Sequence, residues 1–366
     1  MNILHIAPDF PNSKLYPQLI TTLEGIGCNN SVYVQSEGVD DTHSYPVYFL
    51  GRNFGIIDRI LFFRKQNVIF NDIEHRNLVK DIKIIHAHQL FSAGYNAYRI
   101  KKKYHIPYVV AVRNTDVNDF FHKMVHLRSL GVSIMREAEA VIFLSPSYRD
   151  SVINQYVPNK YRQEVLEKCY VIPNGLDSFF MGNKATVSRK LKKEKNVRLI
   201  YVGDIDKNKN VGTTIKSCQI LRDRGYKVSL DVVGKIMDKK LEYIKSVDFV
   251  NYHPFSPKEE VLDYIRKSDI FVMPSIHETF GLVYIEAMSQ GLPVIYSKGQ
   301  GFDGYYAEGE VGYHVPCFDE NAIADSIIKI MADYETISNN CINAVESFSW
   351  EKKADDYLKI YQSILA

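Results

Sequence analysis

The sequence lacks the features of a disulfide-stapled, zinc-binding or membrane-spanning protein. Its five cysteines are odd in number and widely spaced and form no Cys-x-x-Cys pair, which argues against disulfides and zinc and favours a reducing compartment. No window approaches the ~18 uncharged apolar residues that a spanning helix needs. The N-terminus enters a strand-like run directly, so we expect no signal peptide. These absences predict a cytoplasmic protein, at most bound to the inner face of the cell membrane.

The sequence also lacks a large excess of positive or negative charge. A formal net charge of +2, from 45 basic and 43 acidic residues, gives no reason to expect nucleic acid as a partner. No Gly-x-Gly-x-x-Gly follows the first strand-like run, which argues against a dinucleotide dehydrogenase. The 366 residues exceed the size at which single hydrophobic cores stop growing, so we expect two domains.

Short β-branched runs alternate with helix-like stretches along the whole chain, and several runs are almost wholly apolar, as in parallel sheets buried on both faces. The pattern pauses in a lysine-rich stretch, residues 183–196, which we interpret as the inter-domain connection, and then restarts. The predicted strands are Ile3–Ala7, Ser31–Val34, Pro46–Leu50, Ile82–His86, Tyr108–Val112, Ala140–Leu144, Tyr170–Ile172, Val197–Val202, Val228–Val233, Phe249–Tyr252, Ile270–Met273 and Pro293–Tyr296.

This alternation predicts an α/β fold with two Rossmann-like, doubly wound domains that face each other across a cleft. We expect an N-terminal domain over residues 1–180 on the acceptor side, and a C-terminal domain over residues 197–348 on the donor side. A final amphipathic helix falls in residues 349–366. Ligands of such sheets bind outside the carboxyl ends of the strands, so loops after strands are where function is expected.

The most informative loop follows the predicted strand Ile270–Met273. Glu278 lies in the loop, Gly281 opens a helix, and Glu286 lies further along that helix. Free backbone N–H groups at the helix start can receive a diphosphate, and a glycine there permits close approach. Two carboxylates at this spacing can accept hydrogen bonds from vicinal sugar hydroxyls. The alternative is an ordinary amphipathic helix with a glutamate near its positive end.

This segment resembles the Glu-x7-Glu signature of glycosyltransferase family 4, retaining enzymes with the GT-B fold. The resemblance implies that Glu278 faces the donor sugar and Glu286 holds the nucleotide ribose. It also implies that the last helix crosses back to the N-terminal domain, and it places Phe280, Gly281 and Leu282 at the donor. Other segments agree in the same order: His86-Ala87-His88, Pro173-Asn174-Gly175, Tyr201-Val202-Gly203 and Phe348-Ser349-Trp350.

A second loop begins at Gly203. In the family it supplies an Arg and a Lys to the donor diphosphate; Lys209 matches the Lys, but Asp204 stands near the place of the Arg. A carboxylate beside a diphosphate is repulsive unless a cation lies between them. Asp204 and Asp206 also form an Asp-x-Asp, so Mg²⁺ is an alternative, although the resemblance implies that no metal or other cofactor is required.

A third loop carries Arg113, Asn114 and Asp116 where the family usually has His-Gly-Thr-Asp. Arg113 can contact a phosphate oxygen, or it can be a structural residue paired with Asp116. The family's histidine role is then unfilled or taken on the acceptor side by His88 or His122.

Two basic and apolar stretches, residues 56–65 and 121–128, suggest contact with an anionic membrane and a polyprenyl-linked acceptor. The alternative is that both are helices with their apolar faces in the core.

We therefore expect a retaining glycosyltransferase that moves a hexose-type sugar from a UDP- or GDP-sugar to a saccharide or lipid-linked saccharide. Surface polysaccharide assembly is the expected setting, with Glu278, Lys209 and Arg113 as catalytic residues. The alternatives are a non-catalytic GT-B partner subunit and a nucleotide-sugar 2-epimerase. The latter would convert UDP-N-acetylglucosamine without an acceptor.

Overall fold

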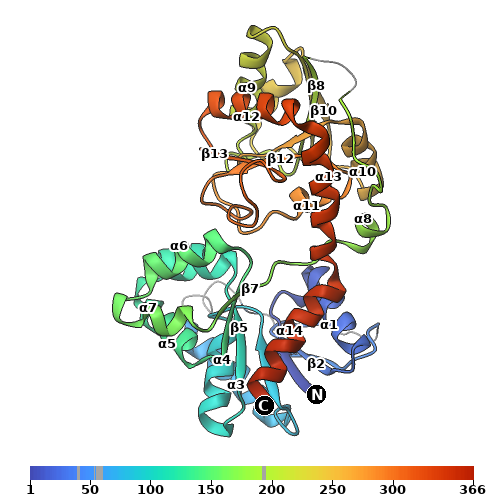
Figure 1. Cartoon of the computed structure of the whole chain (residues 1–366). Coiled ribbons are helices and arrows are strands. Elements are labelled where there is room, and N and C mark those ends of the chain that lie inside the picture. Colours follow the sequence, from blue (N-terminus) through green and yellow to red (C-terminus); the bar gives the residue numbers. More distant parts are fainter. Residues whose placement is uncertain (39–41, 53, 55–60, 192–194) are drawn as a thin grey trace. The chain divides into compact units, whose positions relative to one another are not determined.

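The computed structural model describes residues 1–38, 42–52, 54, 61–191 and 195–366 (Figure 1). The chain forms two compact units. Unit 1 comprises Met1–Leu144, Arg149–Gly175 and Trp350–Ala366, and unit 2 comprises Ser145–Tyr148 and Leu176–Ser349. Each unit is built on one parallel sheet, so the predicted α/β class with two doubly wound domains is confirmed.

The sheet of unit 1 has seven strands in the order β3-β2-β1-β4-β5-β6-β7. The order reverses between β1 and β4, which makes the space beyond their carboxyl ends the expected ligand position. All residues of β4, β5 and β6 are buried, which explains their continuous apolar character. The strands are β1 (Asn2–Ile6), β2 (Asn29–Val34), β3 (Val47–Phe49), β4 (Ile84–Ala87), β5 (Tyr108–Ala111), β6 (Ala140–Phe143) and β7 (Cys169–Val171).

The helices around this sheet include α14 (Trp350–Leu365), the last helix of the chain, which lies beside α1 (Leu15–Gly25) (Figure 1). Its residues Trp350, Tyr357 and Tyr361 are buried in the core of unit 1. A side chain at Gly175 would overlap the indole of Trp350, so this glycine lets the chain pass the indole ring. The other helices are α3 (Phe62–His75), α4 (Gly94–Tyr104), α5 (Arg128–Glu137), α6 (Pro146–Tyr156) and α7 (Asn159–Leu166).

The sheet of unit 2 has six strands in the order β10-β9-β8-β11-β12-β13, and its order reverses between β8 and β11. The strands are β8 (Asn196–Val202), β9 (Lys227–Val233), β10 (Val250–His253), β11 (Ile270–Val272), β12 (Val294–Ser297) and β13 (Gly312–Val315). The helices are α8 (Ser178–Gly182), α9 (Val211–Asp223), α10 (Lys258–Lys267), α11 (Leu282–Ser289), α12 (Glu320–Ala332) and α13 (Tyr334–Val345).

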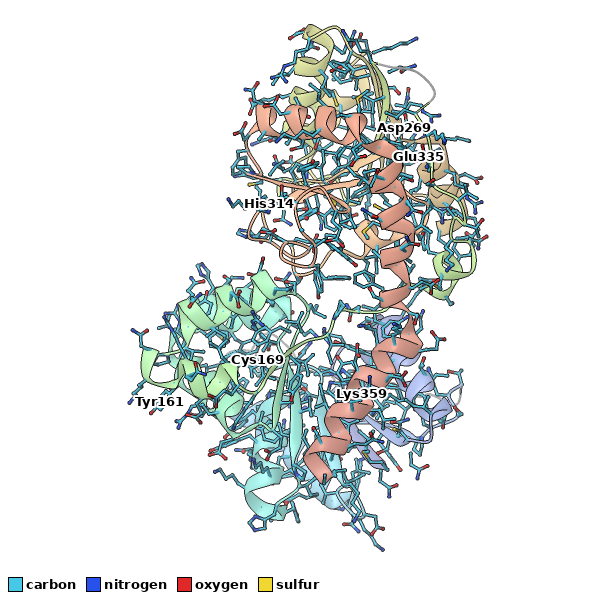
Figure 2. The ribbon with its side chains drawn as sticks, viewed as in Figure 1. Tyr161, Cys169, Asp269, His314, Glu335 and Lys359 are labelled. Carbon is cyan, nitrogen blue, oxygen red and sulfur yellow. The ribbon has the colours of Figure 1, made fainter. Side chains whose placement is uncertain are left out.

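One charged side chain fixes the amino-terminal edge of this second sheet. Asp269, at the start of β11, accepts hydrogen bonds from the backbone N–H of Arg198 and, at 2.6 and 3.0 Å, from its guanidinium (Figure 2). The Tyr334 hydroxyl donates to the carbonyl of Asp269 at 2.8 Å. Arg198 and Asp269 therefore form a bidentate ion pair at the amino-terminal ends of the strands, the edge opposite the loops where a ligand is expected.

Some elements differ from the sequence-based expectation. The predicted strands did not include β13, and no helix was expected at α13; residues Lys239–Ser246 form a 3₁₀ helix. In the lysine-rich stretch 183–196, the backbone N–H of Ala185 donates to Ser289 at 2.7 Å, so this part packs on unit 2. Lys192 and Lys193 lie outside the described residues. Within the described ranges, no helix is long and apolar enough to cross a membrane.

Candidate active site

In unit 2, the loops after β8 and β11 are bonded to each other at the point where the strand order reverses. The Asn208 side chain donates to the carbonyl of His277 and accepts from its N–H, both at 3.0 Å. The N–H of Ile276 donates to the carbonyl of Asn208 at 2.7 Å. Asn210, in the left-handed conformation at the start of α9, donates to Pro274 at 3.1 Å. The two loops therefore form one rigid rim.

This rim brings together Lys209 and Glu278, two residues that are 69 positions apart in the sequence. The ammonium of Lys209 lies 2.6 Å from Oε2 of Glu278, and the two side chains are only 24% and 12% exposed. The other carboxylate oxygen accepts the N–H of Thr279 at 3.1 Å. The backbone of Lys209 is fixed in turn by Asp206, whose carboxylate accepts its N–H at 2.8 Å. Both predicted residues are thus fixed in position.

The start of α11 lies directly after this pair. Gly281 has φ +85°, a left-handed conformation that favours glycine, and a side chain there would overlap Tyr284. The first N–H groups of a helix have no partner within the helix, and the helix dipole makes this end positive. Leu282 opens the helix, so its N–H is among these donors. An anionic group is therefore favoured here.

A glycine-rich loop after β12 supports Glu278 from the other side. The N–H of Gly301 donates to the carbonyl of Glu278 at 2.9 Å, and the side-chain oxygen of Gln300 accepts the Glu278 N–H at 3.1 Å. A Cβ at Gly301 would lie 2.8 Å from Cγ of Glu278 and 2.9 Å from the nitrogen of Phe280. Only glycine fits this contact without displacing the glutamate.

The same loop is anchored by an aspartate. Asp303 accepts the N–H of Gly299 through one oxygen and lies 2.7 Å from Nδ1 of His314 through the other. The hydroxyl of Ser147 donates to the carbonyl of Asp303 at 2.8 Å. The glycine-rich loop is therefore held in one conformation by hydrogen bonds to Asp303.

Glu286 lies one turn further along α11, where it is half-buried. Burial raises the pKa of this carboxyl to about 7, and the negative charge of Asp177 adds to the rise. Phe280, also predicted at the donor, is 2% exposed, and its ring packs against Phe302 and Phe348. The Phe280 side chain therefore belongs to the core beneath the site.

Asp204 is exposed, and its carbonyl accepts the hydroxyl of Tyr201 at 2.8 Å. Gly203 has φ +151°, and a side chain at Gly234 would overlap the Gly203 carbonyl, so the β8 and β9 loops approach closely here. Asp206 is engaged with the backbone of Lys209. In the described part of the chain, no third ligating side chain joins Asp204 and Asp206, since the group found there with metal-binding spacing consists of three histidines.

In unit 1, Asp116 is fully buried and accepts three backbone N–H bonds, from Leu90 at 2.9 Å, Phe91 at 3.0 Å and Arg113 at 2.8 Å. Burial raises the pKa of this carboxyl to about 6, and the three hydrogen bonds oppose part of the rise. Asp116 thus ties the loop after β5 to the loop after β4.

Arg113 points toward the core of unit 1. Its Nε donates to the carbonyl of His88 at 3.3 Å. Burial raises the pKa of Tyr16 and Tyr357, and the guanidinium of Arg113, hydrogen-bonded to both hydroxyls, opposes part of this rise. The contact between Asp116 and Arg113 described above involves the arginine's backbone.

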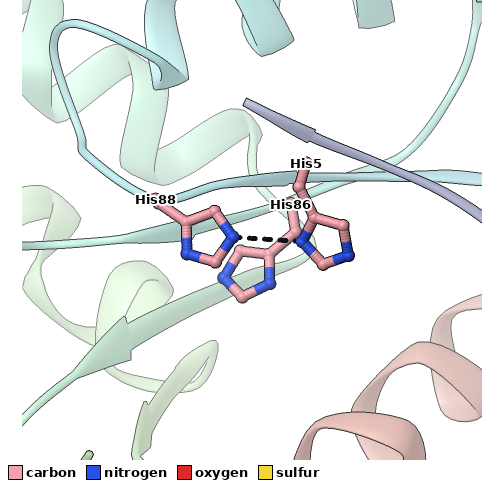
Figure 3. Close-up of side chains that lie close together, drawn as sticks. All are labelled: His5, His86 and His88. Atoms are coloured by element: carbon pink, nitrogen blue, oxygen red, sulfur yellow. Dashed lines mark hydrogen bonds between the residues drawn. The ribbon is translucent and has the colours of Figure 1, made fainter. Parts of the chain in front are cut away.

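The two histidines predicted on the acceptor side lie in different environments. His88 is fully buried beside His5 and His86 (Figure 3), with Nε2 at 3.0 Å from Nδ1 of His5. His122 is exposed, directly after the π-helix Asp116–Phe121. Nothing in the sequence pattern pointed to His5, which lies inside a strand.

A cavity of about 520 Å³ opens where the strand order of unit 1 reverses. Its lining combines aromatic rings with polar and charged groups. The side chain of Gln89 donates to Asp9, and Gln35 is 5% exposed with Oε1 lacking a hydrogen-bond partner among the described residues. The lining side chains relevant to binding are those of Asp9, Gln35, Phe62, Lys65, Gln89, Phe120 and Lys123.

Several of these residues were not predicted from the sequence as site residues: Asp9, Gln35 and Gln89 in this cavity, and Asn208 in unit 2. Their only sequence signal is position, since all except Asn208 lie within the first few residues after a predicted strand. Of the stretch 56–65, residues 56–60 lie outside the described residues.

Comparison with known proteins gives two family matches that together span most of the chain. Residues 18–178 match the model of Glycosyltransferase Family 4, and residues 183–348 match that of Glycosyl transferases group 1. The chain is 25% identical over 248 residues to a D-inositol 3-phosphate glycosyltransferase of Paenarthrobacter aurescens (64% of this chain, 59% of the relative). It is 30% identical over 241 residues to the capsular polysaccharide biosynthesis glycosyltransferase CapM of Staphylococcus aureus (60% of this chain, 61% of the relative). The chain thus spans about three fifths of the length of these two relatives.

Solved structures share the fold over the full chain. The lipopolysaccharide outer core galactosyltransferase WaaB superposes with a TM-score of 0.76 at 14% identity, covering 100% of both chains. Anabaena HepE in complex with UDP and glucose superposes with a TM-score of 0.66 at 17% identity, covering 99% of this chain and 100% of HepE. The expected GT-B fold is therefore confirmed.

Proposed function

The chain belongs to glycosyltransferase family 4, and from this premise we propose that it transfers a hexose-type sugar, with retention of anomeric configuration, from a UDP- or GDP-sugar. The observation that carries this proposal is the Lys209–Glu278 pair at the start of α11, 2.6 Å apart. A lysine, a helix N-terminus and a carboxylate together supply what a diphosphate-linked sugar needs: positive charge for the phosphates and an acceptor for sugar hydroxyls.

In this proposal Lys209 and the N–H groups at Gly281 and Leu282 neutralise the leaving diphosphate. Catalysis is positioning and charge stabilisation, because such groups act most strongly where negative charge develops. Glu278 accepts from the hydroxyls of the transferred sugar, and Glu286 accepts from the nucleotide ribose. Asp204 and Gly203 border the diphosphate, and no metal ion takes part.

Arg113 is the third catalytic residue of this proposal, in which its positive charge contributes to the stabilisation of negative charge. Burial raises the pKa of Asp9, while the Gln89 hydrogen bond and the positive charges of Lys65 and Arg113 lower it in part, so the charge of Arg113 acts on a residue that lines the cavity of unit 1. The loop that carries Arg113 is held in place by Asp116.

We propose that the acceptor is a saccharide or lipid-linked saccharide bound in this cavity. Phe62 and Phe120 offer apolar faces to a sugar ring, while Asp9 can accept its hydroxyls. The capsular role in the name of the Staphylococcus relative supports a place in surface polysaccharide assembly.

Contact with the inner face of the membrane is the second part of this proposal. Phe63 and Val125, 50% and 57% exposed, follow two residues that line the cavity, Phe62 and Met124. Lys123, two residues before Val125, is a basic neighbour whose ammonium lies 2.5 Å from the carboxylate of Asp119. Apolar side chains with basic neighbours suit an anionic lipid surface.

The test is a transfer assay. The protein is incubated with isotopically labelled UDP- and GDP-sugars, singly, and with polyprenyl-diphosphate-linked saccharides, and products are resolved by mass spectrometry and NMR. Acceptor-dependent release of UDP or GDP and a product of retained configuration are expected. Consumption of no donor would favour a non-catalytic partner subunit, and conversion of UDP-N-acetylglucosamine alone would favour an epimerase. Co-sedimentation with anionic and neutral liposomes tests the membrane contact, and equal recovery with both would remove it.

A further inference from the structure

Three histidines meet on one face of the unit 1 sheet, next to Arg113, whose Nε donates to the carbonyl of His88. His5 on β1 is the register partner of His86 on β4, and His88 is two residues further, so all three side chains project from the same face. All three are fully buried. One ring nitrogen from each lies within 4.8 Å of the corresponding atoms of the other two (Figure 3).

Hydrogen bonds around the cluster fix where the protons lie. The amide nitrogen of Asn30 donates to the carbonyls of Ile20 and Cys28, both at 3.3 Å, so its oxygen faces His5 and accepts from Nε2 at 3.1 Å. Nδ1 of His5 therefore carries a lone pair. It lies 3.0 Å from Nε2 of His88, which donates the proton between them.

The ring of His86 is also oriented by a residue outside the histidine cluster. Its Nδ1 lies 2.7 Å from the hydroxyl of Tyr361 on α14. Its Nε2 and the Nδ1 of His88 are buried and lack a hydrogen-bond partner among the described residues. Leaving a buried polar atom unsatisfied costs about 1–3 kcal/mol, so two such nitrogens in one core cluster require an explanation.

We propose that His5, His86 and His88 form a binding site for a divalent transition-metal ion of the zinc type. A His-x-His pair on one strand and a histidine on its neighbour supply three imidazole ligands, a set that suits Zn²⁺ and Co²⁺. Metal-bound histidines ordinarily use their other nitrogen to bond a fixed partner, and Asn30 and Tyr361 occupy that position for His5 and His86.

Binding requires a local rearrangement with no net loss of protons. His5 binds through Nδ1, His86 through its unpartnered Nε2, and His88 through Nε2, whose proton moves to Nδ1 of the same ring. The ion therefore satisfies one of the two unpartnered nitrogens, that of His86. The rings of His86 and His88 are stacked with centroids 3.9 Å apart, so one must turn for both lone pairs to reach a common ion at roughly 2.0–2.1 Å. The ion would link β1 and β4, with Tyr361 of α14 bonded to one of its ligands.

The experiment measures metal rather than sugar transfer, so its outcome is independent of the proposed function. Chelator-treated full-length protein is titrated with Co²⁺ and Zn²⁺, followed by the visible absorption of Co²⁺, by metal content after gel filtration and by the melting temperature. About one tightly bound ion per chain, a tetrahedral Co²⁺ spectrum and a higher melting temperature are expected.

Three variants decide where the ion binds. His86→Gln should lose the ion. Tyr361→Phe keeps the packing of α14 but loses the bond to His86, and should weaken metal affinity about 10–100-fold. His105→Asn removes an exposed histidine at φ +58°, a conformation that asparagine tolerates, and should bind metal like the wild type.

If His86→Gln does not fold, the affinity of Tyr361→Phe decides alone. No binding by the wild type would overturn the proposal. So would equal affinity in Tyr361→Phe and the wild type, because the ion would then bind elsewhere.

Discussion

The ammonium of Lys209 lies 2.6 Å from the carboxylate of Glu278, and this pair joins the loops that follow the two central strands of unit 2. Each residue is also held through a backbone N–H, that of Lys209 by Asp206 and that of Glu278 by Gln300. A diphosphate that arrives at the start of α11 therefore meets a lysine that already has an anionic partner. The positive charge of Lys209 must then be shared between the Glu278 carboxylate and the phosphates.

The first prediction concerns the lysine. Lys209→Ala should lower kcat/KM for the nucleotide sugar by about 100-fold or more, the loss typical when one preorganised charge at a developing anion is removed. Lys207→Ala, two residues away and exposed, is the matched control and should stay near wild-type activity. Initial rates at varied donor concentration measure both. Comparable losses in the two variants would show that the loop's total charge, rather than Lys209 itself, matters.

The second prediction separates affinity for the diphosphate from turnover. Glu278→Gln removes the negative charge from the pair and frees the lysine, so UDP or GDP should bind about fivefold more tightly, which corresponds to ~1 kcal/mol. Sugar transfer by the same variant should fall, because the carboxylate that accepts the sugar hydroxyls is gone. Isothermal titration with UDP and GDP, together with transfer rates, tests this. Weaker nucleotide binding in Glu278→Gln would mean that Glu278 does not compete for Lys209.

Much of this site was predictable because it follows from the order of the strands. The apolar runs at Val197–Val202 and Ile270–Met273 predicted buried strands, and loops after such strands gather at one edge of a sheet. The pattern of strands and loops predicted that both loops lie at one edge of the sheet, and the family resemblance singled out Lys209 and Glu278 within them. The sequence could not show that the two side chains bond each other, since that depends on the fold of both loops.

The misses have physical causes. Strand β13 begins at Gly312, a residue type that is uncommon in strands, and a side chain there would overlap the carbonyl of Val294. Helix α13 carries a helical stripe of buried residues, among them Tyr334, Ile337, Cys341 and Val345, and packs against α11. It follows α12 with no strand between them, so an alternation of strands and helices did not predict it. The histidine cluster escaped prediction because His5 becomes a neighbour of His86 only through the pairing of β1 with β4.

The third prediction concerns pH and Glu286. With a pKa of about 7 before the donor binds, this carboxyl is largely protonated below neutrality, and then it cannot accept two ribose hydroxyls. The KM for the donor should therefore rise about tenfold per pH unit once the pH is well below 7, because each pH unit below the pKa lowers the carboxylate fraction about tenfold. In Glu286→Gln the KM should be high and independent of pH over this range. A wild-type KM that does not change between pH 5.5 and pH 8, two values about one unit or more on either side of the pKa, would contradict the ribose contact.

The raised pKa of Glu286 also predicts that this carboxyl destabilises the folded protein at high pH, where donor binding is best. The pKa of Glu286 rises from 4.5 to about 7 in the folded protein, so the folded state binds the proton more tightly than the unfolded state. The stabilisation from this proton is complete below pH 4.5 and is lost as the pH rises through about 7. Glu286→Gln should therefore gain stability relative to the wild type as the pH rises from 5 to about 8, the range that spans the shift. Urea unfolding at both pH values measures the difference, and an equal gap between variant and wild type at both would contradict it.

The last prediction tests whether the glycine-rich loop positions Glu278. In Gly301→Ala the new methyl carbon would lie 2.8 Å from Cγ of Glu278 and 2.9 and 3.0 Å from the backbone nitrogen and oxygen of Phe280. Two of these three contacts are backbone atoms that cannot turn aside, so the loop must shift, at a cost of about 1–3 kcal/mol. The glutamate would move with it, and kcat should fall more than the melting temperature alone explains. Gly182→Ala is the control, because nothing lies within 4 Å of a Cβ there, and it should preserve both properties. If Gly301→Ala retained wild-type kcat while it lost stability, the loop would support the fold of unit 2 without setting the position of Glu278.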